Sequence, residues 1–298
     1  MTTTGTPPTA TATATASATA SASASAVRGG GWSRLLRRPV LSLGLGLVVV
    51  LVLAGVLAPL LAPAAPAQQG PLALAHPSAA HPLGTDEYGR DLFSRVLYGL
   101  RQDVFATVVA VPIGALAGIL IGLASGLARW LDTAVQRLFD VMLSFTALIA
   151  GVTVAMIIGS GGTAVMVTIA LVNVPLFGRL IRSSVVGERQ RDYVVAATAI
   201  GSGRVRILVR HILPNGLDPL IVQFALSMST AVFIEGGMSY VGLGIRPPAP
   251  SLGSLLQGSM NFLAQNPWYA IGPMAAVTLL VLGFQLVADG LTASLLRR

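Results

Sequence analysis

The chain has 298 residues, of which 54% are hydrophobic and only 10% are charged, and its net charge is +8. Because soluble domains carry about 25% charged residues, this composition predicts a protein embedded in lipid. The absence of cysteine excludes disulfide bonds, thiolate metal sites and thiol nucleophiles. All nineteen basic residues are arginine, so the chain lacks the lysine that a Walker A nucleotide-binding loop requires.

The N-terminal part of the chain divides into two segments. Residues 1–27 are near-repeats of Thr, Ala, Ser and Pro with too few large apolar side chains to offset the entropy of ordering, which predicts a disordered tail. Residues 28–62 hold a basic patch and then an apolar run, which predicts a first membrane anchor. A cleaved signal peptide ending near 65–67 is the alternative, but an apolar run of about 22 residues exceeds the length of a signal-peptide core.

The predicted membrane core, 104–292, contains five further apolar runs long enough to cross a bilayer. With the first run, 40–61, they predict an all-α integral membrane protein with six transmembrane helices; the later five cover 104–127, 138–159, 162–181, 218–241 and 270–292. Six crossings put both termini on one side. Cytoplasmic termini, including an end segment at 293–298, place fifteen arginines inside and four outside, as the positive-inside rule requires. The same rule explains the basic charge without a nucleic-acid partner.

The predicted external loop, 63–103, has apolar residues at helical spacing from Leu92 onward. This pattern predicts an amphipathic helix at the membrane interface, or alternatively one that leads directly into the second span. The loop also carries a carboxylate cluster of Asp86, Glu87 and Asp91. No paired histidine accompanies the cluster, so we expect neither a metal site nor catalysis there.

Three ionisable residues lie close to the predicted spans, namely Asp140, Glu235 and Asp289. Charged groups at membrane depth are costly and are therefore candidates for function. All three lie toward the end of a span, where water or headgroups reach them. The sequence therefore favours structural or interfacial roles for them over lining of a translocation path, and it offers no mid-span acid for a proton-coupled carrier.

The predicted cytoplasmic loop, 183–216, contains two short helical stretches separated by Gly201-Ser202-Gly203. The second stretch, 204–213, is basic, has apolar residues at i, i+3, i+4 and i+7, and is ended by Pro214. Small residues in the first stretch let the backbone of a partner approach closely. The pattern predicts a compact knob that docks on another protein; the alternative is a solvated basic loop near anionic lipid.

Three separate motifs, in this order along the chain, resemble one family. Segment 83–95 and segment 235–253 resemble the outer-loop and fifth-span motifs of the C-type permeases of dipeptide, oligopeptide and nickel transporters. Between them, Ala196-Ala197, Gly201 and Leu213-Pro214 resemble the cytoplasmic "EAA" loop of permeases in binding-protein-dependent ABC importers, and the whole resemblance covers roughly 35–298. The chain departs from the pattern twice, with Val195 in place of the motif Glu and Leu252 where Trp is usual.

The resemblance implies the type I ABC importer permease fold, in the bacterial inner or plasma membrane, without catalysis by this chain. It implies that the EAA loop docks as a coupling helix on a separate ATPase, through Asp192, Tyr193, Ala196, Ala197, Gly201, Ser202, Gly203, Arg204, Leu213 and Pro214. It also implies that an external binding protein docks on Arg246, Pro247, Pro248 and Pro250.

The implied partners are a second homologous permease in a heterodimer, two ABC ATPase subunits or domains, an extracytoplasmic solute-binding protein and the lipid bilayer. ATP and Mg²⁺ would be held by the ATPases, and this chain is expected to bind no cofactor and no metal. The implied function is one half of a translocation pathway for dipeptides, oligopeptides or related small solutes, with nickel or another small molecule as the alternative solute.

Two other classes of membrane protein compete with this interpretation. An ion-coupled secondary transporter would need internal repeats with broken helices at matching positions, and the chain has no convincing half-to-half repeat. A membrane-embedded enzyme would need an acid pair, a Ser–Lys pair or a His-rich site within the spans. Lysine is absent, and the three histidines, His76, His81 and His211, all lie in predicted loops.

Overall fold

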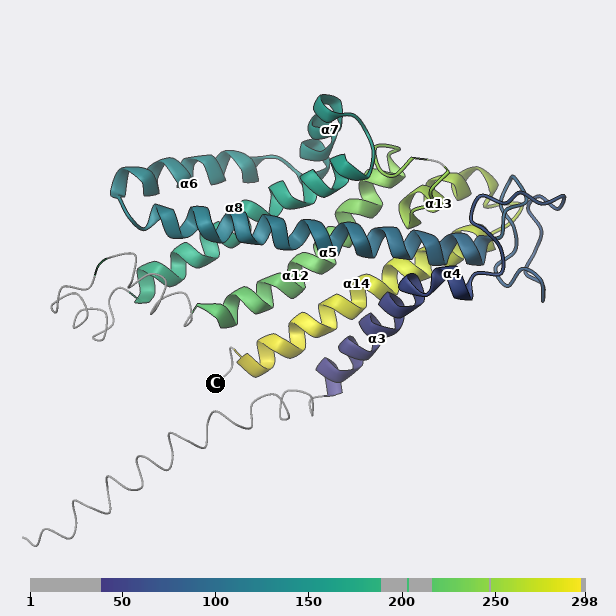
Figure 1. Cartoon of the computed structure of the whole chain (residues 1–298), viewed down its shortest axis with the longest axis horizontal. Coiled ribbons are helices and arrows are strands. Elements are labelled where there is room, and N and C mark those ends of the chain that lie inside the picture. Colours follow the sequence, from purple (N-terminus) through teal and green to yellow (C-terminus); the bar gives the residue numbers. More distant parts are fainter. Residues whose placement is uncertain (1–38, 189–202, 204–215, 247, 296–298) are drawn as a thin grey trace, which may run out of the picture.

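A computed structural model describes residues 39–188, 203, 216–246 and 248–295, and this part of the chain is helical, with no strand. The long helices run side by side in an elongated bundle, and the chain between α4 and α5 folds over one end (Figure 1). We call residues 62–91 the cap and this end the cap end. The helices are α3 (Pro39–Val56), α4 (Ala58–Leu61), α5 (Leu92–Ser125), α6 (Arg129–Ser144), α7 (Ala147–Ile158), α8 (Gly162–Glu188), α12 (Leu217–Tyr240), α13 (Leu252–Ser259), the 3₁₀ turn η2 (Met260–Phe262) and α14 (Trp268–Leu295).

Five of the described helices, α3, α5, α8, α12 and α14, are long and apolar enough to cross a membrane. The span expected over 138–159 is not a straight helix, because α6 and α7 meet at a bend of 95°. Phe145 and Thr146 have extended backbone conformations at this bend. The reason lies in α6, which is amphipathic and begins well before residue 138, so its polar face does not suit a straight crossing. Counted as one broken span, the pair raises the number of crossings to six.

The amphipathic segment after Leu92 does not form a separate helix at the interface. It is the beginning of α5, a single helix of 34 residues that continues through Pro112 to Ser125. Asp91 caps its first turn by accepting a hydrogen bond from the backbone N–H of Ser94 at 2.8 Å. At 1.5 Å per residue α5 is about 51 Å long, whereas the hydrocarbon core is about 30 Å thick. The expected boundary at residue 103 is therefore absent, α5 is longer than a straight crossing requires, and its first turn carries the end of the cap.

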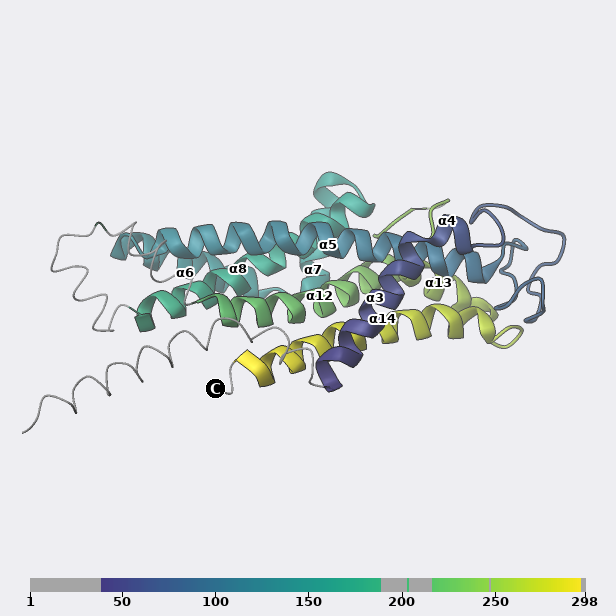
Figure 2. The same cartoon turned by 60° about the horizontal axis from the view of Figure 1, so that its bottom comes forward.

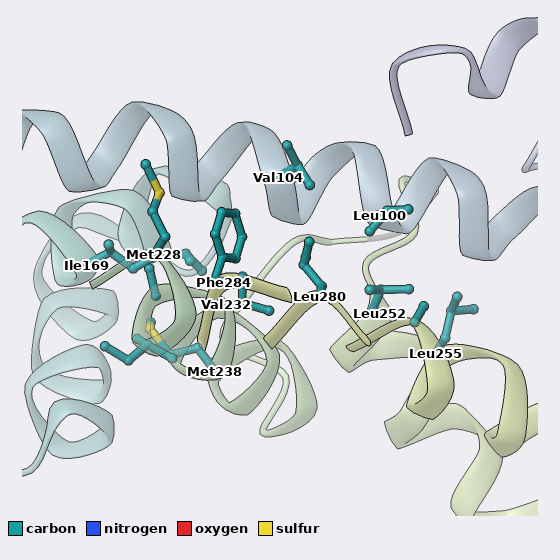
Figure 3. Close-up of a cluster of buried hydrophobic side chains, with 14 of the residues drawn as sticks. Leu100, Val104, Ile169, Met228, Val232, Met238, Leu252, Leu255, Leu280 and Phe284 are labelled. Atoms are coloured by element: carbon teal, nitrogen blue, oxygen red, sulfur yellow. The ribbon is translucent and has the colours of Figure 1, made fainter. Parts of the chain in front are cut away.

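The apolar core joins helices that are far apart in the sequence. Leu100 and Val104 of α5 face Leu280 and Phe284 of α14, with Met228 and Val232 of α12 beside them (Figure 3). Leu252 and Leu255 extend the cluster into α13. The short α13 is thus packed on the bundle through its apolar side chains.

Glycines bring two helix pairs into backbone contact. Gly114, Gly118 and Gly122 stand one turn apart on the face of α5 that meets α8, and a Cβ on Gly118 would overlap the carbonyl oxygen of Val174. Where α3 crosses α14 (Figure 2), Gly44 of α3 packs against the backbone of α14, and Gly290 of α14 packs against the backbone of α3. Because lipid removes the hydrophobic drive between helices, close packing of this kind is what holds membrane helices together.

Candidate functional site: the cap, its pocket and the root of the predicted coupling loop

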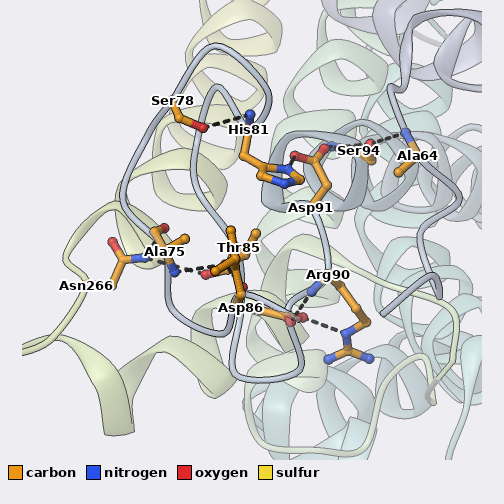
Figure 4. A network of polar contacts seen from close by, with 11 residues as sticks. Ala64, Ala75, Ser78, His81, Thr85, Asp86, Arg90, Asp91, Ser94 and Asn266 are labelled. Atoms are coloured by element: carbon orange, nitrogen blue, oxygen red, sulfur yellow. Dashed lines mark hydrogen bonds and ion pairs between the residues drawn. The ribbon is translucent and has the colours of Figure 1, made fainter. Parts of the chain in front are cut away.

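Asp86 organises the cap. Its carboxylate is fully buried and accepts hydrogen bonds from the backbone N–H groups of Tyr88 and Arg90, each at 2.9 Å (Figure 4). Its second oxygen accepts from the Arg90 side chain at 2.6 Å and from Arg95 at the start of α5. A carboxylate with this many donors is satisfied even without water. Asp86 therefore ties the cap to the bundle.

Two further contacts attach the cap. Asn266, which is buried in the turn before α14, donates from its side chain to the carbonyl of Ala75 at 3.1 Å. His81 lies 2.9 Å from the carboxylate of Asp91, which also accepts from the Ser94 hydroxyl at 2.6 Å (Figure 4). The positive φ of Gly84 and Gly89, +82° and +72°, allows the tight turns on either side of Asp86.

The carboxylate cluster expected in this loop is not one site. Asp86 pairs with arginines, Asp91 caps α5, and Glu87 accepts a hydrogen bond from the Tyr269 hydroxyl of α14 at 2.6 Å. No group of three or more His, Cys, Asp or Glu residues suited to a metal occurs among the residues that the structure describes. The pairing of His81 with Asp91 was not predicted, because ten residues separate them in a loop without periodicity.

A pocket of about 430 Å³ opens at the cap end, between the cap, the start of α5, the loop that follows α12, and α13 and α14. We call it the cap pocket. Its volume lies in the range of small-molecule sites, about 300–1,000 Å³. Three arginines and one acid line it, with polar neutral groups between them; the residues that bear on function are Glu87, Arg90, Arg95, Arg246, Gln257 and Tyr269. The sequence did not reveal it, because its walls come from segments up to 200 residues apart.

A second feature lies beneath the cap pocket. The carboxyl groups of Asp103 on α5 and Glu235 on α12 are fully buried and lie close enough to interact. Among the residues that the structure describes, Oδ1 of Asp103 and Oε2 of Glu235 have no hydrogen-bond partner. Asp103 accepts from the backbone N–H of Leu252 at 3.3 Å, and Glu235 from the hydroxyl of Ser239, a residue of the pocket wall, at 2.6 Å. The expectation that water reaches Glu235 was wrong, because α13 covers the end of α12.

At the opposite end of the bundle, α8 and α12 flank the predicted coupling loop. Ser184 of α8 packs against Gly216, the residue that precedes α12, and a Cβ on Gly216 would lie 3.3 Å from the Ser184 side chain. The two ends of the predicted loop are therefore close together, and α8 ends and α12 begins at the same end of the bundle (Figure 1). A force applied to such a loop reaches both helices together.

Two ion pairs join α6 to the same end of α8. Arg182 makes a bidentate contact with Asp132, at 2.6 and 2.8 Å, and Arg179 pairs with Asp140. Between the pairs, the buried ring of Phe139 fills the space above Gly178, where a Cβ would overlap it. The sequence assigned these arginines to membrane orientation alone, and their acidic partners stand 39 and 50 residues away.

Most of the predicted coupling residues lie outside the described part of the chain: Asp192, Tyr193, Ala196, Ala197, Gly201, Ser202, Arg204, Leu213 and Pro214. Gly203 is described and is exposed. Of the predicted binding-protein contacts, Arg246 and Pro248 are exposed at the cap end and Pro247 is outside the described residues. Pro250 is buried directly before Ser251, the N-cap of α13, and so is not accessible for docking.

The family model for the inner membrane component of binding-protein-dependent transport systems matches residues 110–298, more than half of the chain. The chain belongs to this family. A second model, for the N-terminal transmembrane domain of oligopeptide transport permease C, matches residues 29–77. The chain is thus a multi-pass inner membrane component of an ABC transport system, and the two models together account for both the first anchor and the bundle.

Named relatives match along most of their own length. The dipeptide transport system permease protein of Alkalihalophilus pseudofirmus is 36% identical over 89% of this chain and 88% of its own. The dipeptide permease protein of Haemophilus influenzae is 36% identical over 85% of this chain and 88% of its own. A probable D,D-dipeptide permease protein of Escherichia coli is 39% identical over 72% of each.

The fold also matches a solved transporter. The match is to a chain of the inward-facing MetNI methionine ABC transporter, with a TM-score of 0.56 and 19% sequence identity. It covers 67% of the present chain and 96% of the MetNI chain. At this identity the match concerns the fold alone, which is that of a type I ABC importer permease.

Proposed function

We propose that this chain is one of two permease subunits that together form the pathway of an ATP-driven importer for dipeptides, oligopeptides or related small solutes. The observation that carries the proposal is the similarity to dipeptide permeases from distant bacteria, at 36% identity over more than four fifths of the chain. The absence of lysine supports a division of labour in which separate ATPase subunits hold ATP and Mg²⁺.

In this proposal the loop at 183–216 transmits the work of the ATPases. The sequence predicts a basic helix with an apolar stripe in this loop, which suits a groove with an acidic rim, and the small residues of the loop suit a close approach of backbones. The contact between Ser184 and Gly216 supports a common response of α8 and α12. The pairs Arg182–Asp132 and Arg179–Asp140 then pass the same movement to α6.

Two further partners are part of the proposal, a second permease and an external binding protein. A second, homologous permease completes the pathway, and an extracytoplasmic binding protein delivers the solute at the cap end, near Arg246 and Pro248. This orientation places the cap outside and both termini in the cytoplasm, as the arginine distribution favours. Exposed apolar side chains along the bundle, such as Ile113 and Leu116 of α5, then face lipid or the second permease.

The orientation has a direct test, because the natural chain contains no cysteine. Ser78→Cys places a single thiol in the cap, and Ser202→Cys places one in the predicted coupling loop. In intact cells, a membrane-impermeant maleimide should label the first variant alone, and permeabilised cells should show labelling of both. Labelling of Ser202→Cys in intact cells would overturn the proposed arrangement.

Coupling is tested with a matched pair of substitutions, Gly201→Leu and Gly46→Leu. Gly46 has open space around its Cα on the lipid-exposed part of α3, so leucine there should change neither uptake of a labelled dipeptide nor co-purification of the ATPases. Gly201→Leu should leave membrane insertion intact while abolishing both. Normal ATPase association in the Gly201 variant would exclude the loop as the docking element.

A further inference from the structure

The charges in the cap pocket do not cancel. Three guanidinium groups line it, those of Arg90, Arg95 and Arg246, together with one carboxylate, that of Glu87. Asp86 lies behind the wall and forms ion pairs with both Arg90 and Arg95. Glu87 also lies 3.6 Å from Arg90. On the cap side of the pocket, Asp86 and Glu87 therefore balance the charges of Arg90 and Arg95. The charge of Arg246 is not compensated by either acid.

Arg246 is held by a neutral group. Its guanidinium donates to the hydroxyl of Ser160, with Nε at 3.1 Å, on the loop between α7 and α8. Among the residues that the structure describes, no aspartate or glutamate forms an ion pair with it. The hydroxyl orients the side chain without neutralising it. A positioned and uncompensated guanidinium at the edge of a pocket is suited to an anion from outside the chain.

The rest of the lining suits the other parts of a small peptide. The side-chain amide of Gln257 provides both a donor and an acceptor, the combination that matches a peptide bond. Glu87, whose side chain is 23% exposed, offers a carboxylate to an ammonium group while Tyr269 fixes its position. The pocket thus presents groups of both signs, separated by neutral hydrogen-bonding groups, as recognition of a zwitterion requires.

From these observations we infer that the cap pocket binds the free carboxylate of a short peptide through Arg246, so that the permease itself selects the solute that enters. The inference rests on the proposed function and adds a recognition step within the permease. Arg246 is then a specificity residue, and Glu87 orients the amino end of the same solute. A purely structural water-filled cavity would show no preference between charged and blocked peptide termini.

The test uses the purified complex of this chain with its partner permease and ATPases, without the binding protein. Equilibrium binding of radiolabelled dialanine is measured, with dialanine and dialaninamide as competitors. Because a hydrogen bond to a charged group contributes about tenfold or more in affinity, wild type should prefer the free acid by that factor. Arg246→Gln should weaken dialanine binding about tenfold and abolish the preference over the amide. Arg101→Gln, which alters an exposed arginine of α5 outside the pocket lining, is the matched control and should retain both.

The amino end is tested separately. Glu87→Gln keeps an acceptor for Tyr269 and should weaken dialanine while leaving the affinity for N-acetyl-dialanine unchanged. The inference is overturned if wild type shows no saturable binding of dialanine, or if Arg246→Gln keeps the preference for the free acid. It is also overturned if Arg246→Gln binds dialanine normally and slows uptake of acid and amide equally, because Arg246 then serves docking of the binding protein. Failure of the proposed function looks different: the complete system would then import no peptide at all.

Discussion

Asp86 in the cap and Arg95 in α5 form an ion pair that is withdrawn from solvent, with side chains 0% and 8% exposed. The pair joins a loop without regular structure to the first turn of a 34-residue helix. Arg90 shares the same carboxylate oxygen. The Asp86 carboxylate therefore makes a large contribution to the shape of the cap and of the pocket wall that the cap forms.

Replacing this carboxylate by an amide should strongly destabilise the protein. Asp86→Asn removes the counter-charge of Arg95 and one of the two acids that pair with Arg90, and removal of one partner of a buried pair costs about 3–5 kcal/mol. Thermal unfolding of the purified permease complex should shift downward accordingly. Asp289→Asn, on an exposed position of α14, is the control and should stay within about 0.5 kcal/mol of wild type. Equal unfolding temperatures for the two variants would contradict the role assigned to Asp86.

The proximity of the buried carboxyl groups of Asp103 and Glu235 leads to a second prediction. Two carboxyl groups in contact repel each other when both are ionised. An amide at position 103 can donate to Glu235 and still accept from Leu252, so Asp103→Asn should be neutral or stabilising. Asp103→Ala leaves the buried Leu252 N–H without its acceptor and should cost about 1–3 kcal/mol. The comparison is made by thermal unfolding, and an Asn variant as unstable as the Ala variant would refute it.

Close packing of α5 on α8 predicts an unequal response to alanine. Gly118→Ala places a methyl group against the Val174 carbonyl and 3.1 Å from the Phe177 Cβ, so the helices must separate, at about 1–3 kcal/mol. Gly46→Ala meets nothing within 4 Å and should be neutral or slightly stabilising. Unfolding temperatures of the two variants decide the matter, and the prediction fails if Gly118→Ala is as stable as Gly46→Ala.

The bidentate pair between Arg182 and Asp132 should behave as one unit. Both side chains are about one-third exposed, at 35% and 32%, so solvent screening limits the pair to about 1 kcal/mol or less. Arg182→Gln and Asp132→Asn should each lose about that amount, and the double variant should lose no more than either alone. Additive losses in this double-mutant cycle would mean that the two residues act independently.

The wider fold could be predicted from the sequence where the signal is local. Runs of about 20 apolar residues mark helices that cross lipid, because no other segment satisfies its backbone there. Five of the runs appear as single long helices in the structure. The sequence left open whether the amphipathic start of α5 is a separate interfacial helix or leads directly into the second span, and the structure shows the latter. The sequence misjudged the 138–159 run, whose break at Phe145 and Thr146 carries no Pro or Gly signal.

The candidate site was harder to predict for a physical reason. Loop residues lack a period, so nothing in the order of His81, Asp86 and Asp91 indicates which partner each one meets. Arg246 and Glu87 are separated by most of the chain, yet they line the same pocket.

The sequence by itself determined that the chain is a lysine-free helical membrane protein, where its apolar crossings lie, and which family its motifs resemble, since all of these depend on residues near one another along the chain. The tertiary structure alone decided which charges are paired and that Asp103 and Glu235 lie close together in the interior. It also placed the uncompensated Arg246 at the edge of the cap pocket. Charge pairing depends on distance in space, and that distance is set only when helices remote in sequence pack together.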